Sequence, residues 1–199
     1  MDRRVDCISY EIVHRGFYPK SVLHLRFRRF DGTMSEEISR DMLEQGRAAV
    51  ILPYDPARDE VLLIEQFRPA PLLMDEDPWL FEAVAGRVEE GEDPAATALR
   101  EAVEEAGIEI EAVEPAGIGY SSPGCLKELV ILYVGRCRLE GVGGGTHGLD
   151  HESEDIRVHV VPFAEAMAMA KDGRLRNLPS LVTLYHLALH RDELRRRWA

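Results

Sequence analysis

Residues 86–108 read GRVEEGEDPAATALREAVEEAGI, with three glutamates inside residues 101–105. At spacings of three and four residues, Glu101, Glu104 and Glu105 share one face of a helix, where like charges repel by a few tenths of a kcal/mol per pair. A bound cation would offset this repulsion, and Mg²⁺ prefers oxygen ligands, water and substrate phosphates. The stretch is therefore interpreted as a metal and phosphate site, although a bare glutamate run is more commonly a solvated helix face.

Local signals mark both ends of this helix. Asp93 is the expected N-cap, Pro94 the first helical residue, and Gly107 the left-handed residue at the C-terminal end. A packing face opposite the glutamates is expected at positions i, i+3, i+4 and i+7, which are Leu99, Ala102, Val103 and Ala106.

The wider spacing is more specific than the glutamates alone. Gly86 is followed by five residues, Glu92, seven residues, Arg100-Glu101, and then Glu104-Glu105 before Gly107-Ile108. This pattern matches the Nudix box position for position, and the chain is identified as a member of the Nudix hydrolase superfamily. The resemblance implies an α/β fold, a Nudix α/β/α sandwich with a mixed sheet. It also implies hydrolysis of nucleoside diphosphates linked to another group.

Bulk composition agrees with a small globular enzyme. The chain has 199 residues, 45% of them apolar, enough for one full core and a small appendage. The net charge of −12 argues against nucleic acid or an anionic membrane as a partner. The charged start MDRRVDCISY lacks the apolar stretch of a signal peptide, and three cysteines suit a reducing compartment. A cytoplasmic location is expected.

The order of predicted elements suggests two units. Strands are expected in CISYEIVHR, SVLHLRFRRF and MSEEIS, followed by a short helical linker at residues 41–45. AAVILPY and EVLLIEQF form a predicted β-hairpin around DPARD. Further strands are expected near residues 82–85, 111–118, 129–137 and 156–161, with helices at 164–171 and 180–191. A mixed sheet covered by helices follows.

The N-terminal strands cannot easily bury a core of their own. We therefore expect a small N-terminal β-sheet domain at residues 1–45 and the Nudix domain at residues 46–199. From near Arg15 onward the chain resembles the bacterial ADP-ribose pyrophosphatase branch of the superfamily. In that branch the N-terminal sheet exchanges between protomers, which implies a homodimer with active sites drawn from both chains.

Segments outside the box carry this branch resemblance. They are PWLFEAVAG, SSPG with Pro123 fifteen residues after Ile108, and HGLDHESEDIRVHVV. Taken alone, Pro123-Gly124 is simply a turn. The resemblance implies hydrolysis of ADP-ribose to AMP and ribose 5-phosphate.

The resemblance also implies a set of metal ligands. These are Glu101, Glu105 and the carbonyl oxygen of Ala85, with Glu154 as an additional ligand. They would hold about two or three Mg²⁺ or Mn²⁺ ions per site. Glu104 is expected close by, as ligand or support.

The general base is placed by resemblance at Glu152, in an acidic stretch that could otherwise be a solvated loop. The roles of Glu152 and Glu154 could be reversed. Arg100 is expected to orient a box glutamate through a bidentate ion pair, and Glu92 to brace the loop or a metal-bound water. A purely structural ion pair remains open for Arg100 and Glu92. His147 and His151 are interpreted as surface histidines, since a third ligand for a transition metal is not evident.

Substrate-binding residues are also carried over from the resemblance. Arg68 is matched to a diphosphate contact, Arg40 and Asp41 to the adenosine end, and Phe17 to a ring that stacks on adenine from the other protomer. Phe17 could equally fill a core. Ser122 and Glu128 are matched to the terminal ribose, but residues 125–127 depart from the small hydroxyl-bearing pattern there. The implied set also includes Tyr18, Arg87 and Gly124.

Two other functions stay open. One is the same chemistry on another nucleotide sugar, such as GDP-mannose. The other is a non-catalytic ADP-ribose sensor, which the intact box disfavours.

Overall fold

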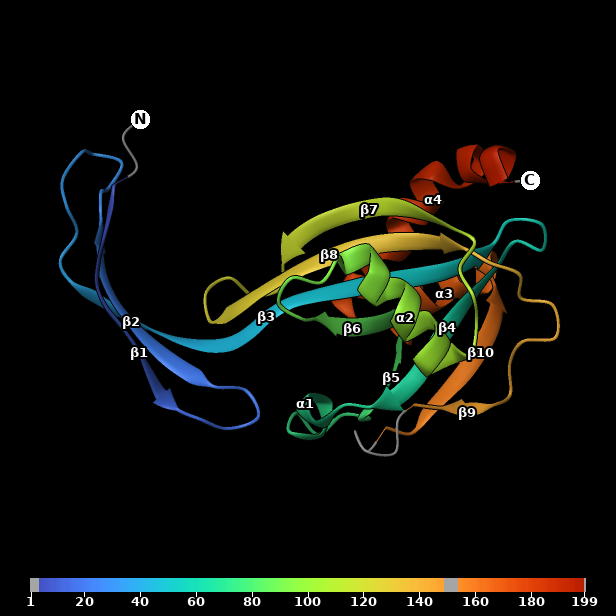
Figure 1. The fold of residues 1–199 in the computed structure, drawn as a ribbon, viewed down its shortest axis with the longest axis horizontal. Coiled ribbons are helices and arrows are strands. Elements are labelled where there is room, and N and C mark those ends of the chain that lie inside the picture. Colours follow the sequence, from blue (N-terminus) through green and yellow to red (C-terminus); the bar gives the residue numbers. More distant parts are fainter. Residues whose placement is uncertain (1–3, 149–153, 199) are drawn as a thin grey trace. The chain divides into compact units, whose positions relative to one another are not determined.

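The structure is a computed structural model that describes residues 4–148 and 154–198 (Figure 1). The chain divides into two compact units. The first comprises residues 1–46 and 120–129, and the second comprises residues 47–119 and 130–199. The long strand β3 (Ile38–Asp55) and strand β8 (Leu126–Arg136) each contribute residues to both units.

The first unit is built on β1 (Val5–His14) and β2 (Lys20–Phe27), which pair antiparallel. The first part of β3 pairs with β2. The helical linker predicted at residues 41–45 is wrong, because these residues continue β3. Asp41 pairs with Val22, and the amide of Leu43 donates to the Cys125 carbonyl at 2.8 Å. Sheet hydrogen bonds from distant residues thus override the local helical preference.

The segment MSEEIS is less regular than expected. Met34 forms one isolated bridge with Arg28, and regular strand begins only at Ile38.

The second unit contains the larger part of the sheet. Its further strands are β4 (Glu60–Phe67), β5 (Trp79–Glu82), β6 (Val84–Val88), β7 (Ala112–Tyr120), β9 (Thr146–His147) and β10 (Ile156–Pro162). Strand β4 pairs with β5 and β10, β3 pairs with β4, β6 and β8, and β8 pairs with β7. The predicted hairpin is confirmed by the pairing of Tyr54 with Val61.

Helices complete this unit. They are α1 (Pro69–Leu72), α2 (Pro94–Ala106), α3 (Phe163–Asp172) and α4 (Leu178–Trp198). In the part of the chain that the structure describes, none is long and apolar enough to cross a membrane.

Alternate residues of the central strands enter different cores, as the two-residue period of a strand requires. Val50, Leu52 and Leu63 pack with residues of α3 and α4. Ile51 and Leu62 belong to a second cluster, with Ala98, Ala102 and Ala106 of α2. Helices therefore cover both faces of the sheet, and the predicted α/β sandwich is confirmed.

Both predicted ends of α2 are confirmed. The Asp93 carboxylate accepts from the amide of Ala95 at 3.2 Å, Pro94 is the first helical residue, and Gly107 has φ +64°. These local signals depend on the backbone groups that every helix end leaves unpaired.

The predicted packing face of α2 is partly wrong. Leu99 and Val103 are 37% and 52% exposed, whereas Ala98, Ala102 and Ala106 are buried. Small side chains let α2 lie close to the sheet, and the face that is buried also includes Glu105. The buried face of α2 is therefore rotated away from the predicted packing face.

Asp59 joins the β3–β4 turn to α4. Its backbone is left-handed, with φ +58°. Its carboxylate accepts from the Tyr54 hydroxyl at 2.8 Å and from Nε of Arg191 at 2.7 Å. The hydrogen bond from Arg191 holds the pKa of Asp59 below its usual value.

This network predicts that Asp59→Asn lowers the free energy of unfolding by about 1–3 kcal/mol at pH 7. Asn tolerates the left-handed backbone, so the change removes the charge and one acceptor oxygen without straining the turn. Because the pKa of folded Asp59 is depressed, its contribution is lost as pH falls through that pKa. The difference between wild type and variant in urea unfolding should therefore narrow in acid.

Asp192→Asn is the matched control, since this exposed carboxylate lies 4.0 Å from Arg191. It should change stability by less than about 0.5 kcal/mol. Equal stability of Asp59→Asn and wild type at pH 7 would contradict the role given to the network.

Candidate active site

Gly86 of β6 admits the Glu101 carboxyl group of α2. A Cβ built on Gly86 would lie 1.9 Å from Oε1 and 2.1 Å from Cδ of Glu101. These separations are far below van der Waals contact. The glycine at the start of the box is therefore needed for close approach between helix and strand, rather than for an unusual backbone angle.

Glu105 is the most deeply buried glutamate of the helix. It is 3% exposed, and its Oε2 accepts from the amide of Ala85 at 3.1 Å. Burial and the charges of Glu101 and Glu154 raise the pKa of Glu105 to about 8. Burial also raises the pKa of Glu101 to about 7, with Glu104 adding to the effect. Two carboxyl groups are thus held where ionisation is costly unless positive charge is close.

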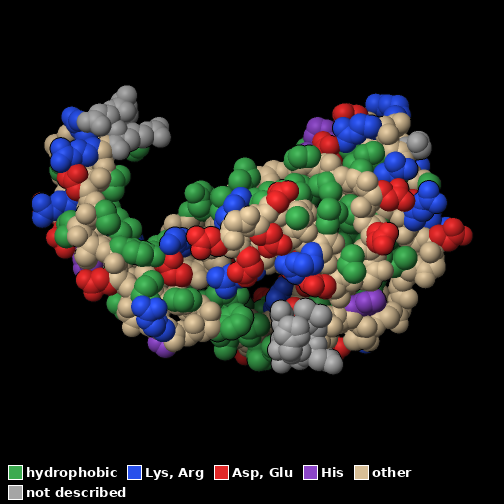
Figure 2. All heavy atoms as spheres, viewed as in Figure 1, with side chains coloured by type: hydrophobic (Ala, Val, Ile, Leu, Met, Phe, Trp, Pro, Cys, Tyr) green, Lys and Arg blue, Asp and Glu red, His purple; other side chains and the backbone are tan. Residues whose placement is uncertain are grey.

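Arg100 supplies positive charge to these glutamates. Its Nη1 lies 2.9 Å from Oε1 of Glu101 and 2.6 Å from Oε2 of Glu104. The predicted bidentate pairing with one glutamate is not observed, because a single guanidinium nitrogen bridges two carboxylates. Figure 2 shows acidic and basic side chains interleaved over the region of α2.

Glu92 braces the loop that precedes α2. Its Oε2 accepts from the amide of Glu89 at 3.1 Å, and its Oε1 lies 3.7 Å from Nε of Arg100. The hydrogen bond from Glu89 lowers the pKa of Glu92. Of the two roles expected for Glu92, bracing the loop or holding a metal-bound water, these contacts fit the first.

Glu154 acts on the same glutamates. Its charge contributes to the raised pKa values of Glu101 and Glu105. The amide of Gly148 donates to the backbone carbonyl of Glu104 at 3.4 Å. Glu152, the expected base, and His151 lie outside the described residues.

The box residues fit the chemistry of a divalent metal. Within residues 4–148 and 154–198, no three carboxylate, histidine or cysteine side chains are gathered closely enough to hold an ion. However, Glu101 and Glu105 lie one turn apart on α2, Glu105 is buried and Glu101 half-buried, and a Cβ at residue 86 would fill the space that Glu101 occupies. Paired carboxylate oxygens are the ligands that a hard divalent cation prefers.

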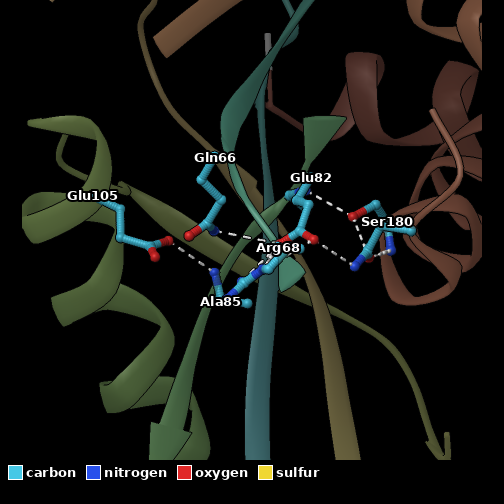
Figure 3. A network of polar contacts seen from close by, with 8 residues as sticks. Gln66, Arg68, Glu82, Ala85, Glu105 and Ser180 are labelled. Carbon is cyan, nitrogen blue, oxygen red and sulfur yellow. Dashed lines mark hydrogen bonds and ion pairs between the residues drawn. The ribbon is translucent and has the colours of Figure 1, made fainter. Parts of the chain in front are cut away.

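A second polar cluster lies beside the first, and sequence reasoning missed most of it (Figure 3). Arg68 donates from Nη2 to Glu82 Oε2 at 2.8 Å. Its charge offsets a small part of the rise in the pKa of Glu105. Gln66 also faces Glu82, with Nε2 at 3.4 Å from Oε2. Polar residues in otherwise apolar strands could have signalled this cluster.

Several predicted substrate residues lie in the first unit. Phe17 is 89% exposed, and its ring meets that of Tyr18 edge to face at 4.8 Å. In this chain Phe17 therefore fills no core. Asp41 pairs with Lys20 at 2.9 Å, and Arg40 Nη1 donates to the carbonyl of Ser39 at 2.7 Å.

The SSPG segment forms a turn at the start of β8. The carbonyl of Ser122 accepts from the amides of Cys125 and Leu126, so Gly124 lies in an ordinary turn. Glu128 is bonded to the Ser121 hydroxyl. This turn belongs to the first unit, whereas the box belongs to the second.

Lys127, where the chain departs from the family pattern, anchors that segment. Its Nζ donates to Glu44 at 2.7 Å and to the Tyr10 hydroxyl at 3.1 Å. Arg87, in the second unit, is exposed on β6 and lies opposite Ala48 of β3.

Comparison with known proteins agrees with this geometry. The NUDIX domain family matches residues 44–181, so the chain belongs to the Nudix family. It is 43% identical to the ADP-ribose pyrophosphatase of Escherichia coli strain K12, over 98% of this chain and 93% of the relative. The ADP-ribose pyrophosphatase of Haemophilus influenzae is 33% identical over 98% of this chain and 90% of its own length.

Two further similarities are informative. The GDP-mannose pyrophosphatase of Cronobacter sakazakii is 30% identical over 95% of this chain and 97% of its own length. A solved structure described as an ADP compounds hydrolase superposes with a TM-score of 0.70, covering 98% of this chain and 96% of that one. At 17% identity, this second similarity concerns the fold.

The close approach at Gly86 predicts the effect of a single methyl group. Gly86→Ala should push the Glu101 carboxyl away and lower kcat by about a hundredfold or more, because Glu101 is an expected metal ligand. The thermal midpoint should change by only a few degrees, since the displaced atoms end a flexible side chain.

Gly119→Ala is the control, because a Cβ there meets nothing within 4 Å. Wild-type kcat in Gly86→Ala would show that Glu101 does not need this position.

Proposed function

We propose that this protein is a metal-dependent ADP-ribose diphosphatase, which cleaves ADP-ribose to AMP and ribose 5-phosphate. The observation that carries the proposal is the pair formed by half-buried Glu101 and buried Glu105, which lie against Gly86 and Ala85 of β6. Full-length similarity to ADP-ribose pyrophosphatases, at higher identity than to GDP-mannose pyrophosphatases, supports the choice of substrate.

Glu101, Glu105, Glu154 and the Ala85 carbonyl are the proposed ligands for Mg²⁺ or Mn²⁺. The bound ions would neutralise the diphosphate and make the attacking water more acidic. Glu104 stays near this group through its ion pair with Arg100. The number of ions, about two or three, follows from the family resemblance.

The chain's own residues then have separable tasks. Arg68 binds the diphosphate, and Arg100 holds Glu101 and Glu104 in position. Glu152 is the proposed base: it takes a proton from water, whose oxygen bonds to phosphorus as the bridging P–O bond breaks. The influence of Glu154 on Glu101 and Glu105 supports assigning the base to this part of the chain.

Three unpaired cysteines are compatible with a cytoplasmic location, which we include in the proposal.

A substrate panel tests the proposal. Purified protein with Mg²⁺ should hydrolyse ADP-ribose with a kcat/KM at least about tenfold above that for GDP-mannose, ADP-glucose, NADH or a diadenosine polyphosphate. A tenfold preference for another member would overturn the ADP-ribose assignment. Tight ADP-ribose binding without turnover would instead favour the sensor.

The metal assignment gives a second prediction. Glu105→Gln should lower kcat by about a thousandfold while α2 keeps its alanine packing face. Glu90→Gln removes the same charge from an exposed box position and should retain wild-type kcat. Wild-type turnover by Glu105→Gln would contradict the assignment.

We also propose that residues 1–45 form a dimerisation domain and residues 46–199 the catalytic domain of a homodimer. Unit 1 exposes a series of large apolar side chains, visible along β1 and β2 in Figure 2. They include Val5, Ile8, Tyr10, Val13 and Phe27. Apolar surface on a two-stranded hairpin is typical of an interface. By family resemblance, Phe17 would reach the partner's active site.

Subunit complementation tests this arrangement. Phe17→Ala should raise KM by about tenfold, while Phe30→Ala, which removes another exposed ring, should not. When Phe17→Ala and Glu105→Gln chains are mixed and allowed to exchange, a mixed dimer contains one intact site if Phe17 acts across the interface. At substrate concentrations well below the KM of Phe17→Ala, activity should then exceed the mean of the parents. Activity equal to that mean, or a monomer in light scattering, would contradict the arrangement.

A further inference from the structure

Glu82 at the end of β5 is a buried carboxylate with donors from three directions. Its side chain is 4% exposed. Nε of Arg68 lies 3.3 and 3.2 Å from its two oxygens, and Nη2 lies 2.8 Å from Oε2. Gln66 and Asn177 donate side-chain amides at 3.4 and 3.1 Å. Figure 3 shows Arg68 and Gln66 converging on this carboxylate.

This geometry fixes the orientation of the Arg68 guanidinium as well as its charge. Nε and Nη2 form one edge of the planar group, and both face Glu82. A guanidinium held along one edge keeps its plane and direction, which a lysine ammonium in the same place could not reproduce. The Arg68 side chain is 42% exposed, so it extends from the buried carboxylate toward solvent.

Asn177 is oriented by the start of α4. Its Oδ1 accepts from the amide of Ser180 at 3.0 Å and from the Ser180 hydroxyl at 2.7 Å. That hydroxyl accepts from the amide of Ala83 at 2.7 Å. Since the oxygen of Asn177 faces the helix, its amide nitrogen must face Glu82. Asn177, the N-cap of α4, therefore directs its Nδ2 donor to the Glu82 carboxylate, which in turn binds Arg68.

We propose that Glu82 is a positioning residue, fixed by Asn177 and Gln66, that aims the Arg68 guanidinium at the substrate diphosphate. The inference rests on the proposed function through the assignment of Arg68 to the diphosphate. If Glu82 served only stability, the direction in which the Arg68 guanidinium points would not matter. The orienting contacts from Asn177 and Gln66, and the proximity of Arg68 to Glu105, give this one a direction toward the box.

Glu82→Gln tests the proposal with nearly unchanged shape. It should lower kcat/KM by about tenfold, mainly through KM, because a neutral amide no longer fixes the arginine that binds the diphosphate. Glu65→Gln is the charge control, since Glu65 lies on β4 and pairs instead with His159 at 2.9 Å. A purely structural role would lower the thermal midpoint of Glu82→Gln and leave its KM unchanged, which would overturn the proposal.

Asn177 provides a second test that does not alter the buried carboxylate. Asp and Ser are both good N-caps, so Asn177→Asp and Asn177→Ser should preserve α4. Asp places a second carboxylate against Glu82, whereas Ser merely loses the donor. The KM of Asn177→Asp should rise at least about threefold above that of Asn177→Ser. Equal KM values would contradict the orienting role.

A double-mutant cycle identifies the residue through which Glu82 acts. Arg68→Lys keeps a cation beside the buried carboxylate but loses the planar fork. If Glu82 acts through Arg68, kcat/KM of Arg68→Lys/Glu82→Gln should equal that of Arg68→Lys within about twofold. Additive losses would overturn the proposal.

The kinetics use whichever diphosphate of the substrate panel the wild-type chain cleaves fastest. A preference for a substrate other than ADP-ribose then refutes the proposed function and leaves the positioning test intact. Normal ADP-ribose turnover with an unchanged KM in Glu82→Gln refutes positioning alone.

Discussion

The enclosure of two carboxyl groups between α2 and β6, one buried and one half-buried, is the constraint on which the site depends. Glu105 is almost fully buried, and Glu101 occupies space that only a glycine at residue 86 leaves open. Burial raises both pKa values, so ionising both groups is costly unless positive charge is close. The folded core is stable enough to hold the two carboxyl groups in place despite this cost. A divalent cation bound between them would remove the cost, and the free energy released would add to its affinity.

The fold explains how such a pair can be built. Alanines at residues 98, 102 and 106 bring α2 close to the sheet, while β3 and β4 send alternate side chains to α2 on one face and to α3 and α4 on the other. Arg68 directly follows β4, and Glu82 ends the neighbouring strand β5. The groups that we propose for the metal and for the diphosphate therefore lie on one sheet and the helix packed against it, as a preorganised site requires.

Features that depend on neighbours in sequence could be predicted. Asp93, Pro94 and Gly107 bound α2 because capping is local, and the β3–β4 hairpin follows from alternating apolar residues around a turn. Features that depend on tertiary contacts could not. The strand at residues 41–45 is held by pairing with β2, and the exposure of Val103 reflects which face the alanines allow to approach the sheet.

Glu82 shows the same limit within the site. It lies in PWLFEAVAG, a segment already singled out, but its significance depends on Arg68, fourteen residues earlier, and on Asn177, ninety-five residues later. The roles of Ser122, Glu128 and Glu152 came from family resemblance rather than from their local chemistry. Sequence spacing can identify a residue with the right chemical group. The residues that orient that group are known only once the chain is folded.

A structure of the protein with Mg²⁺ and a non-hydrolysable ADP-ribose analogue tests the central claim most directly. The account predicts Mg²⁺ bound by Glu101 and Glu105, with the diphosphate reaching both the ions and the guanidinium of Arg68. Metal bound away from these two glutamates, or a diphosphate without contact to Arg68, would contradict it.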